Sequence, residues 1–185
     1  MRYHPPAGEK GEEKVKRLLM CCLPGLAVLL LFSATPAFAG QSTSNFQVTA
    51  SVAANCTISS TNIAFGVYDP VLTNSSTGVD VDAAGSVNIR CTKGTAPNIG
   101  LSLGSNASGS IRRMVDGAGA EYLSYEIYSN AGRTVVWGNS AGSWVVHTPT
   151  GPPNTANYPT YGRITRGQDV APGSYTDTVT ATVNF

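Results

Sequence analysis

The chain has 185 residues, of which 42% are hydrophobic and 12% charged, and its formal net charge is +1. After residue 39, seven basic and eight acidic residues nearly cancel, and neither sign forms a long run. We therefore expect no nucleic-acid partner and no anionic membrane surface, because both are bound through clustered basic residues. The length after residue 39 fits one domain with a sizeable core.

Residues 1–39 have the pattern of an export signal that is removed. Lys14, Lys16 and Arg17 precede an apolar run at 18–32, and the small residues of Ala37-Phe38-Ala39 offer a cleavage site. The apolar run is shorter than the roughly 20 residues that a membrane-spanning helix needs. The sequence therefore predicts an exported protein that begins at about Gly40.

Residues 40–53 contain a segment with the alternation of a β-strand. Its apolar residues, Phe46, Val48, Ala50 and Val52, fall at every second position, which indicates one buried face. The segment precedes the first cysteine of the exported chain and has few local partners. We expect this face to be buried in another molecule, which favours assembly over catalysis.

Cys56 and Cys91 are the cysteines that remain after residue 39. In an exported protein such a pair predicts a disulfide, and its closure of a 35-position loop stabilises the fold by about 3–4 kcal/mol in the chain-entropy model. His147 is the single histidine of this part of the chain. A catalytic base and a metal-ligand set are therefore lacking, so we expect no enzyme activity, no metal and no cofactor. A calcium site at Asp80 and Asp82 is disfavoured, because their alternation with valines is equally that of a strand with an outward polar face.

The fold class is all-β. Short runs rich in Val, Ile, Thr and Tyr recur between clusters of Gly, Pro, Asn and Ser, and helical periodicity is hard to find. Proline and glycine predict a surface loop at 148–159, and a second loop is expected at 105–119. The predicted strands are Phe46–Val52, Thr57–Phe65, Ser86–Cys91, Asn98–Leu103, Tyr122–Tyr128, Thr134–Trp137, Trp144–His147, Tyr161–Thr165 and Ser174–Phe185.

The last predicted strand is the longest and continues to the final residue. With no later segment to cover its open side, we expect this edge to lack a partner within the chain and to accept one from outside. Asp177 falls on its apolar face and is either a partly buried acid that caps a turn, which we favour, or an inward charge that guards the edge. The residues predicted for the acceptor face are Tyr175, Val179, Ala181, Val183 and Phe185.

A series of short phrases follows in order along the chain: Phe46-x-Val48, Cys56-Thr57-Ile58, Phe65-Gly66-x-Tyr68-x-Pro70, Cys91, Leu123-x-Tyr125-x-Ile127-Tyr128, Val136-Trp137-Gly138, Tyr161-Gly162-Arg163-Ile164 and Pro172-Gly173-x-Tyr175-x-Asp177-x-Val179. Each phrase is weak alone, but their order and spacing resemble the spore coat protein U domain family. That family includes subunits of archaic, Csu-type chaperone-usher pili. The resemblance covers residues 41–185, and the long loop at 148–159 is its one clear departure.

The resemblance implies an immunoglobulin-like β-sandwich at residues 54–185 that lacks its final strand. In such pilins a periplasmic chaperone lends a strand, and the N-terminal strand of a neighbouring pilin subunit replaces it at the outer-membrane usher. The implied function is a structural subunit of a pilus that serves surface attachment and biofilm formation. The implied location is the cell surface, reached through the periplasm, or the medium.

An alternative is a self-contained secreted spore-coat or adhesive protein, whose N-terminal strand folds back to complete its own sandwich. Residues 53–55 alone separate the predicted donor strand from Cys56. So short a connection gives little room to swing the strand to a far edge, which favours exchange between molecules.

Overall fold

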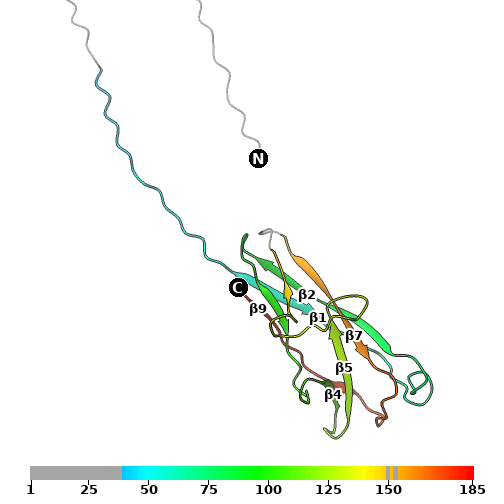
Figure 1. Ribbon diagram of the computed structural model, residues 1–185. Helices are drawn as coiled ribbons and strands as arrows, with labels where there is room; N and C mark the ends of the chain where they lie inside the picture. The colour runs from blue at the N-terminus through cyan, green and yellow to red at the C-terminus, as the bar shows by residue number, and fades with distance from the viewer. Residues whose placement is uncertain (1–38, 149–150, 152–153) are drawn as a thin grey trace, which may run out of the picture. The chain divides into compact units, whose positions relative to one another are not determined.

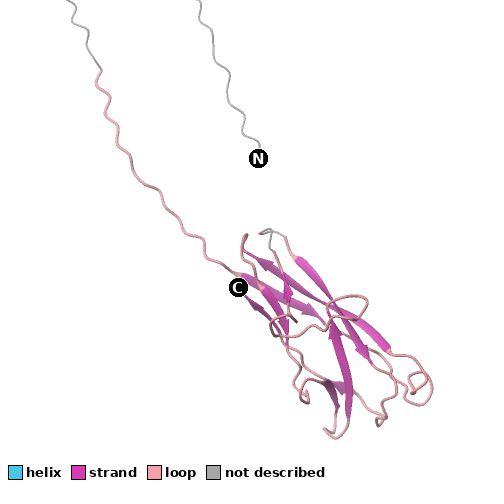
Figure 2. Cartoon of the chain, in the orientation of Figure 1, coloured by secondary structure: helices cyan, strands magenta, loops and turns pink. Residues whose placement is uncertain are grey.

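The computed structural model describes residues 39–148, 151 and 154–185, so the predicted signal peptide lies almost wholly outside the described residues. The described chain divides into two units, residues 39–47 and the folded body at 48–185. All regular secondary structure in the described part is β, which confirms the predicted class (Figure 2). No helix there is long and apolar enough to cross a membrane.

The body consists of two antiparallel sheets (Figure 1). The larger sheet has the strand order β1-β2-β7-β5-β4-β8, and the smaller has the order β6-β3-β9. Strands β8 and β9 both belong to the C-terminal segment, which therefore leaves one sheet and joins the other. The strands are β1 (Cys56–Thr61), β2 (Val81–Cys91), β3 (Asn98–Leu101), β4 (Arg112–Asp116), β5 (Tyr122–Tyr128), β6 (Val145–Val146), β7 (Ala156–Ile164), β8 (Tyr175–Thr176) and β9 (Ala181–Asn184).

The core lies between the two sheets and draws on both. Ile89 of β2 and Ile164 of β7 come from the larger sheet, whereas Ile99 comes from β3 of the smaller one, and all three are at most 1% exposed. Trp137 is fully buried, and its indole Nε1 donates a hydrogen bond of 2.8 Å to the carbonyl oxygen of Ile99. The indole thus adds its large apolar surface to the core without leaving its polar atom unpaired.

Several predicted strands have different bounds in the structure. β1 ends at Thr61 and β3 at Leu101, earlier than predicted, and β6 is only two residues long. β2 begins at Val81, before the predicted start. The expected strand at 134–137 is reduced to an isolated bridge between Tyr128 and Val136. The Asn130 side chain caps this turn by accepting hydrogen bonds from the backbone N–H groups of 134 and 135, and the chain then turns into the core at Trp137.

Two predicted loops contain strand residues. β4 (Arg112–Asp116) lies inside the segment 105–119, and β7 begins at Ala156, inside the segment 148–159. Pro159 is a member of β7, with its ring on the exposed face opposite Ser86. The single predicted strand at 174–185 is divided, because β8 pairs with β4 whereas β9 pairs with β3.

The predicted disulfide is present and joins Cys56, the first residue of β1, to Cys91, the last of β2. It fixes the start of β1 next to the tail. We expect the Cys56→Ser, Cys91→Ser double variant to lose about 3–4 kcal/mol of free energy of unfolding, from the entropy of the loop that the bond closes. Urea unfolding of the two proteins with and without reductant measures this. If reductant left the free energy of unfolding of the unmodified protein unchanged, the expectation would be contradicted. The double variant, which has no disulfide to reduce, is the control.

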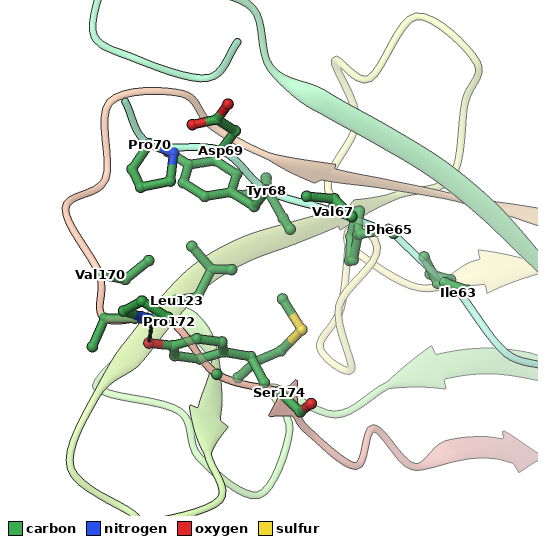
Figure 3. A pocket seen from close by; sticks show the side chains of 17 residues that line it. Ile63, Phe65, Val67, Tyr68, Asp69, Pro70, Leu123, Val170, Pro172 and Ser174 are labelled. Carbon is green, nitrogen blue, oxygen red and sulfur yellow. Dashed lines mark hydrogen bonds between the residues drawn. The ribbon is translucent and has the colours of Figure 1, made fainter. Parts of the chain in front are cut away.

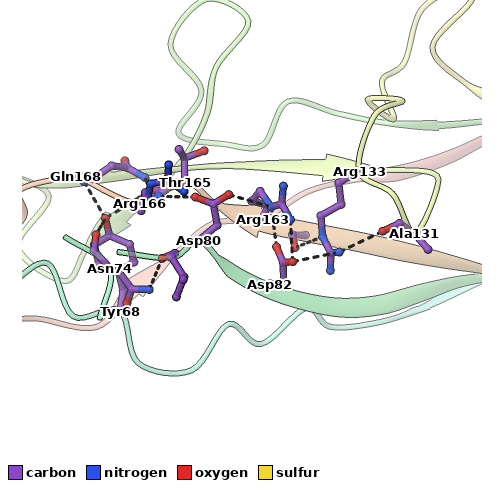
Figure 4. Close-up of polar contacts among 12 residues, drawn as sticks. Tyr68, Asn74, Asp80, Asp82, Ala131, Arg133, Arg163, Thr165, Arg166 and Gln168 are labelled. Carbon is purple, nitrogen blue, oxygen red and sulfur yellow. Dashed lines mark hydrogen bonds and ion pairs between the residues drawn. The ribbon is translucent and has the colours of Figure 1, made fainter. Parts of the chain in front are cut away.

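An ion-pair network covers the outer face of β2 and β7 (Figure 4). Arg163 donates two hydrogen bonds to the Asp82 carboxylate, at 2.8 and 2.9 Å, and Arg133 lies 3.2 Å from the same carboxylate. The hydrogen bond from Arg163 lowers the pKa of Asp82 below its ordinary value. Asp80 accepts a hydrogen bond from the backbone N–H of Arg166 and lies 3.5 Å from Arg163. Both aspartates therefore serve to link strands, which agrees with the outward polar face that the sequence predicted for them.

Candidate functional site: an open apolar groove

The chain leaves the larger sheet after Thr61 because the neighbouring strands make room for it. A Cβ on Gly162 of β7 would lie 2.7 Å from the Phe65 ring, and one on Gly85 of β2 would lie 2.6 Å from the carbonyl oxygen of Thr61. These two glycines let residues 62–65 pass close over the inner face of the sheet. Ile63 and Phe65 then pack against the core, while their neighbours in sequence are exposed.

An open groove separates this segment, residues 60–70, from the C-terminal segment, residues 170–181. It consists of two adjoining cavities of about 650 and 470 Å³, which share the side chains of Ile63, Phe65, Met114 and Tyr175. Figure 3 shows the larger cavity, with Phe65 and Tyr68 on one bank and Leu123, Val170 and Pro172 on the other. Its floor and banks are thus mainly apolar. The other apolar side chains of the smaller cavity are Val87, Leu101, Tyr125, Ile127, Val179 and Ala181.

Both banks present backbone groups that lack partners in the part of the chain that the structure describes. On one bank, residues 62–67 make no backbone hydrogen bond within the described chain. On the other, the carbonyl oxygens of Thr178 and Thr180 accept hydrogen bonds from Ser105 and Ser102, at 3.1 and 2.9 Å. Backbone groups of successive strand residues point to opposite sides. Those of Val179 and Ala181 therefore face the groove, and among the described residues Val179 has no backbone partner.

Asp177 holds the C-terminal segment in its position between the sheets. Its Oδ1 accepts hydrogen bonds from the backbone N–H groups of Ser105 and Asn106, at 2.9 and 3.2 Å, and its Oδ2 accepts one of 2.6 Å from the Tyr125 hydroxyl. Burial and this bond raise the pKa of Tyr125 well above its ordinary value. Gly104 lies so close that a Cβ there would be 1.9 Å from Asp177. Asp177 is thus a turn-capping acid, the first of the two roles considered for it, and the turn it caps is at 104–106.

The structure brings together only some of the predicted site residues. Tyr175, Val179 and Ala181 line the groove, Val183 packs against the core, and Phe185 is 59% exposed. The predicted donor residues lie in a segment without secondary structure. Phe46, Val48 and Val52 are 83–87% exposed, and Ala50 is exposed as well. Among the described residues no strand pairs with 46–52, and a strand forms only where a neighbour satisfies its backbone groups.

The sequence prediction missed the second bank and most of the groove floor. The sequence pattern predicts Ile63 and Phe65 in a strand of the sheet and Met114 in a loop, whereas all three line the groove. The available signal was the alternation of Ile63, Phe65 and Val67, which continues past the end of the pairing of β1 with β2.

The groove is suited to binding an extended peptide. Backbone groups that lack partners among the described residues, those of 62–67 on one bank and of Val179 on the other, flank an apolar floor, which is an arrangement that accepts an added β-strand. The described residues contain no group of three or more His, Cys, Asp or Glu side chains that could hold a metal ion. His147 lies away from the groove residues and contacts the hydroxyl of Tyr158 through Nδ1.

Residues 42–182 match the Spore Coat Protein U domain. The chain belongs to this family. It is also 38% identical over 169 residues to Protein U of Myxococcus xanthus, an alignment that covers 86% of this chain and 92% of the relative. The family relationship implied by the sequence phrases is thereby confirmed.

A solved structure shows the same fold. It is the pre-assembly complex of the chaperone CsuC with the tip adhesion subunit CsuE, from the archaic chaperone-usher Csu pili of Acinetobacter baumannii. The two chains are 27% identical, with a TM-score of 0.52, and the match covers 72% of this chain and 40% of the other. This spore coat protein U domain is therefore an immunoglobulin-like β-structure, as predicted. Its family and fold are those of structural proteins, and it is not an enzyme.

Proposed function

We propose that this protein is a structural subunit of an archaic chaperone-usher pilus and polymerises by donor-strand exchange. One observation carries the proposal: an apolar groove with unpartnered backbone groups on both banks, in a chain whose alternating N-terminal segment exposes its apolar face. The segment with Phe46, Val48, Ala50 and Val52 of one subunit would fill the groove of the next. Backbone hydrogen bonds would give the joint its strength, and the alternate side chains its register.

The position of the tail favours exchange between molecules. The hydroxyl of Thr92 accepts a hydrogen bond from the backbone N–H of Asn55, and the disulfide fixes the next residue, Cys56. We take the donor to run antiparallel to 175–181, the direction found in every strand pair among the described residues, which makes it parallel to the other bank at 60–70. Its end would then lie beside Pro70 and Pro172, at the far end of the groove from Cys56. The four steps from Val52 to Cys56 span at most about 14 Å, which is too short for that return within one chain.

Before assembly, the apolar groove of a free subunit would have to be occupied by another strand. A periplasmic chaperone that lends a strand would provide it, as the chaperone complex of the Csu subunit suggests. Exchange for the tail of the next subunit would follow at an outer-membrane usher, after export directed by the segment 1–39. The product would be a surface fibre for attachment and biofilm formation.

A thermal melt tests the proposal. The body without residues 40–53 is melted with and without a peptide of residues 41–54, and with a control peptide that carries Phe46→Asp and Val48→Asp. We expect low stability alone and a strong rise with the unmodified peptide, which at about 100 times its Kd adds roughly 2.7 kcal/mol. The control peptide should have no effect. A stable body that ignores both peptides would instead support a self-contained secreted coat or adhesive protein.

A further inference from the structure

The loop at residues 69–79 is held in one conformation by a buried side chain. Asn74 is 2% exposed, and its amide accepts a hydrogen bond from the backbone N–H of Asp69 and donates one to the carbonyl oxygen of Val79, both at 2.8 Å. The backbone carbonyl oxygen of Asn74 accepts a hydrogen bond of 2.7 Å from the backbone N–H of Gly167 and one of 3.3 Å from the Tyr68 hydroxyl. A buried amide with all these partners orders the loop.

This ordered loop holds aliphatic side chains in water. Val71 and Leu72 are 78% and 74% exposed, and the adjoining Val67 is 87% exposed. The carboxylate of Asp69 fixes the first two by accepting hydrogen bonds from their backbone N–H groups, at 3.0 and 3.1 Å. Single exposed aliphatic residues are ordinary, but these three lie within six residues of the chain, in and next to an ordered loop, which makes 67–72 a candidate interaction surface.

The loop continues the groove at one end. Val67, Asp69 and Pro70 line the larger cavity, and Val71 and Leu72 follow directly in sequence. A donor strand antiparallel to 175–181 leaves the groove here. Its last apolar residue, Val52, is separated from Cys56 of its own body by three residues, so the two lie at most about 14 Å apart. The body of the donor subunit is thus brought against this loop.

The end of the body that bears the tail also exposes apolar side chains. Val146 is 62% exposed and Phe185 is 59% exposed. They lie at the same end of the smaller sheet, because Asn98 pairs with Val146 on one side and with Asn184, the neighbour of Phe185, on the other. A short turn connects Asn98 to Cys91, the disulfide partner of Cys56.

We propose that the loop of Val67, Val71 and Leu72 binds a second copy of this chain, at the tail-bearing end that exposes Val146 and Phe185. The inference rests on the proposed function and adds to it a contact between the bodies of successive subunits. Such a head-to-tail contact between two different surfaces is heterologous and propagates along a fibre. This contact would restrict bending between successive subunits. Without it, the three residues that connect the donor strand to its own body would allow the two bodies to bend.

Cross-linking of assembled polymers tests the contact. Polymers of a Leu72→Cys, Phe185→Cys double variant are treated with a short bismaleimide and separated under denaturing conditions. We expect a ladder of covalent multimers from this variant and none from either single variant or from Leu72→Cys combined with Val135→Cys. Val135 is 50% exposed and belongs to neither surface.

A second measurement keeps the proposal testable if added cysteines interfere with assembly. Polymers of the Val71→Asp, Leu72→Asp variant should dissociate at least tenfold faster than unmodified polymers, whereas Val135→Asp should change the rate less than twofold. Polymers that give no ladder and dissociate at an unchanged rate would overturn the body contact and leave strand exchange intact. A failure of the unmodified chain to polymerise would overturn the proposed function and this contact with it.

Discussion

Phe46→Asp is expected to abolish polymerisation while the body at 48–185 folds as before. In the free chain Phe46 is 87% exposed, so the substitution removes no contact within the subunit. In the proposed joint the ring would be buried in the groove, which contributes about 1.5–3 kcal/mol. An aspartate there loses this contribution and must also leave water without a partner charge, at a cost of several kcal/mol. Together these changes amount to a loss of affinity of at least about a thousandfold. Val48→Asp is expected to act in the same way.

The measurement is the size distribution of the purified protein by light scattering, together with its circular dichroism spectrum. Gln47→Asp is the matched control, because residue 47 faces away from the apolar side of the same segment. It adds the same charge and should leave polymers unchanged. Polymers of ordinary length from both Phe46→Asp and Val48→Asp would show that this segment is not the donor strand.

The sequence predicted the all-β class and the Cys56–Cys91 disulfide, because both depend on local pattern and composition. Alternation at 175–185 correctly placed Tyr175, Val179 and Ala181 on the inward face. It could not show that the segment changes sheets. That change is set by contacts distant in sequence, since Asp177 binds the backbone of 105 and 106 and β9 pairs with β3.

The groove itself was only half predictable. The alternation in the C-terminal segment predicts one bank of the groove. The position of the other bank depends on where β1 stops pairing with β2. That point is decided by Gly85 and Gly162, whose missing side chains admit residues 62–65. The alternation of Ile63, Phe65 and Val67 is a signal of an extended segment, but it does not show where pairing in the sheet ends.

β4 was missed because its first residues are Arg112 and Arg113, and charged residues between glycine-rich stretches are typical of a loop. Arg112 is nevertheless fully buried. Its guanidinium forms an ion pair with Glu126 and donates hydrogen bonds to backbone carbonyl oxygens. The partners of this buried charge come from three separate parts of the chain. The local sequence therefore could not show that Arg112 is buried.

Arg112→Met is expected to lower the free energy of unfolding by about 3–5 kcal/mol. The guanidinium extends from β4 in the larger sheet to Leu101 and Ser102 at the end of β3 in the smaller one, and to Trp137. Its bonds to Ser102 and Trp137 are each 2.8 Å long. Methionine has a similar length but no donors, so these carbonyl oxygens would lose their partners and Glu126 its counter-charge.

Urea unfolding in a Phe46→Asp background, where we expect a monomer, measures the effect. Arg113→Met is the matched control on the same strand. That guanidinium lies 4.0 Å from the centre of the Tyr122 ring and donates one bond, to the carbonyl oxygen of Asn106, so its loss should cost no more than about 1 kcal/mol. Equal stability losses in the two variants would show that Arg112 does not hold the sheets together.

The same substitution should weaken the acceptor edge. The carbonyl oxygen of Ser102 accepts from Arg112, while its N–H donates to Thr180 at 2.9 Å and its hydroxyl accepts from the Thr180 N–H. Ser102 therefore connects the buried guanidinium to the strand whose other side is open to the groove. In an otherwise unmodified chain, Arg112→Met should shorten polymers even at temperatures where the body is still folded, whereas Arg113→Met should not. Polymers of equal length from both variants at such temperatures would show that the acceptor edge is held independently of this buried charge.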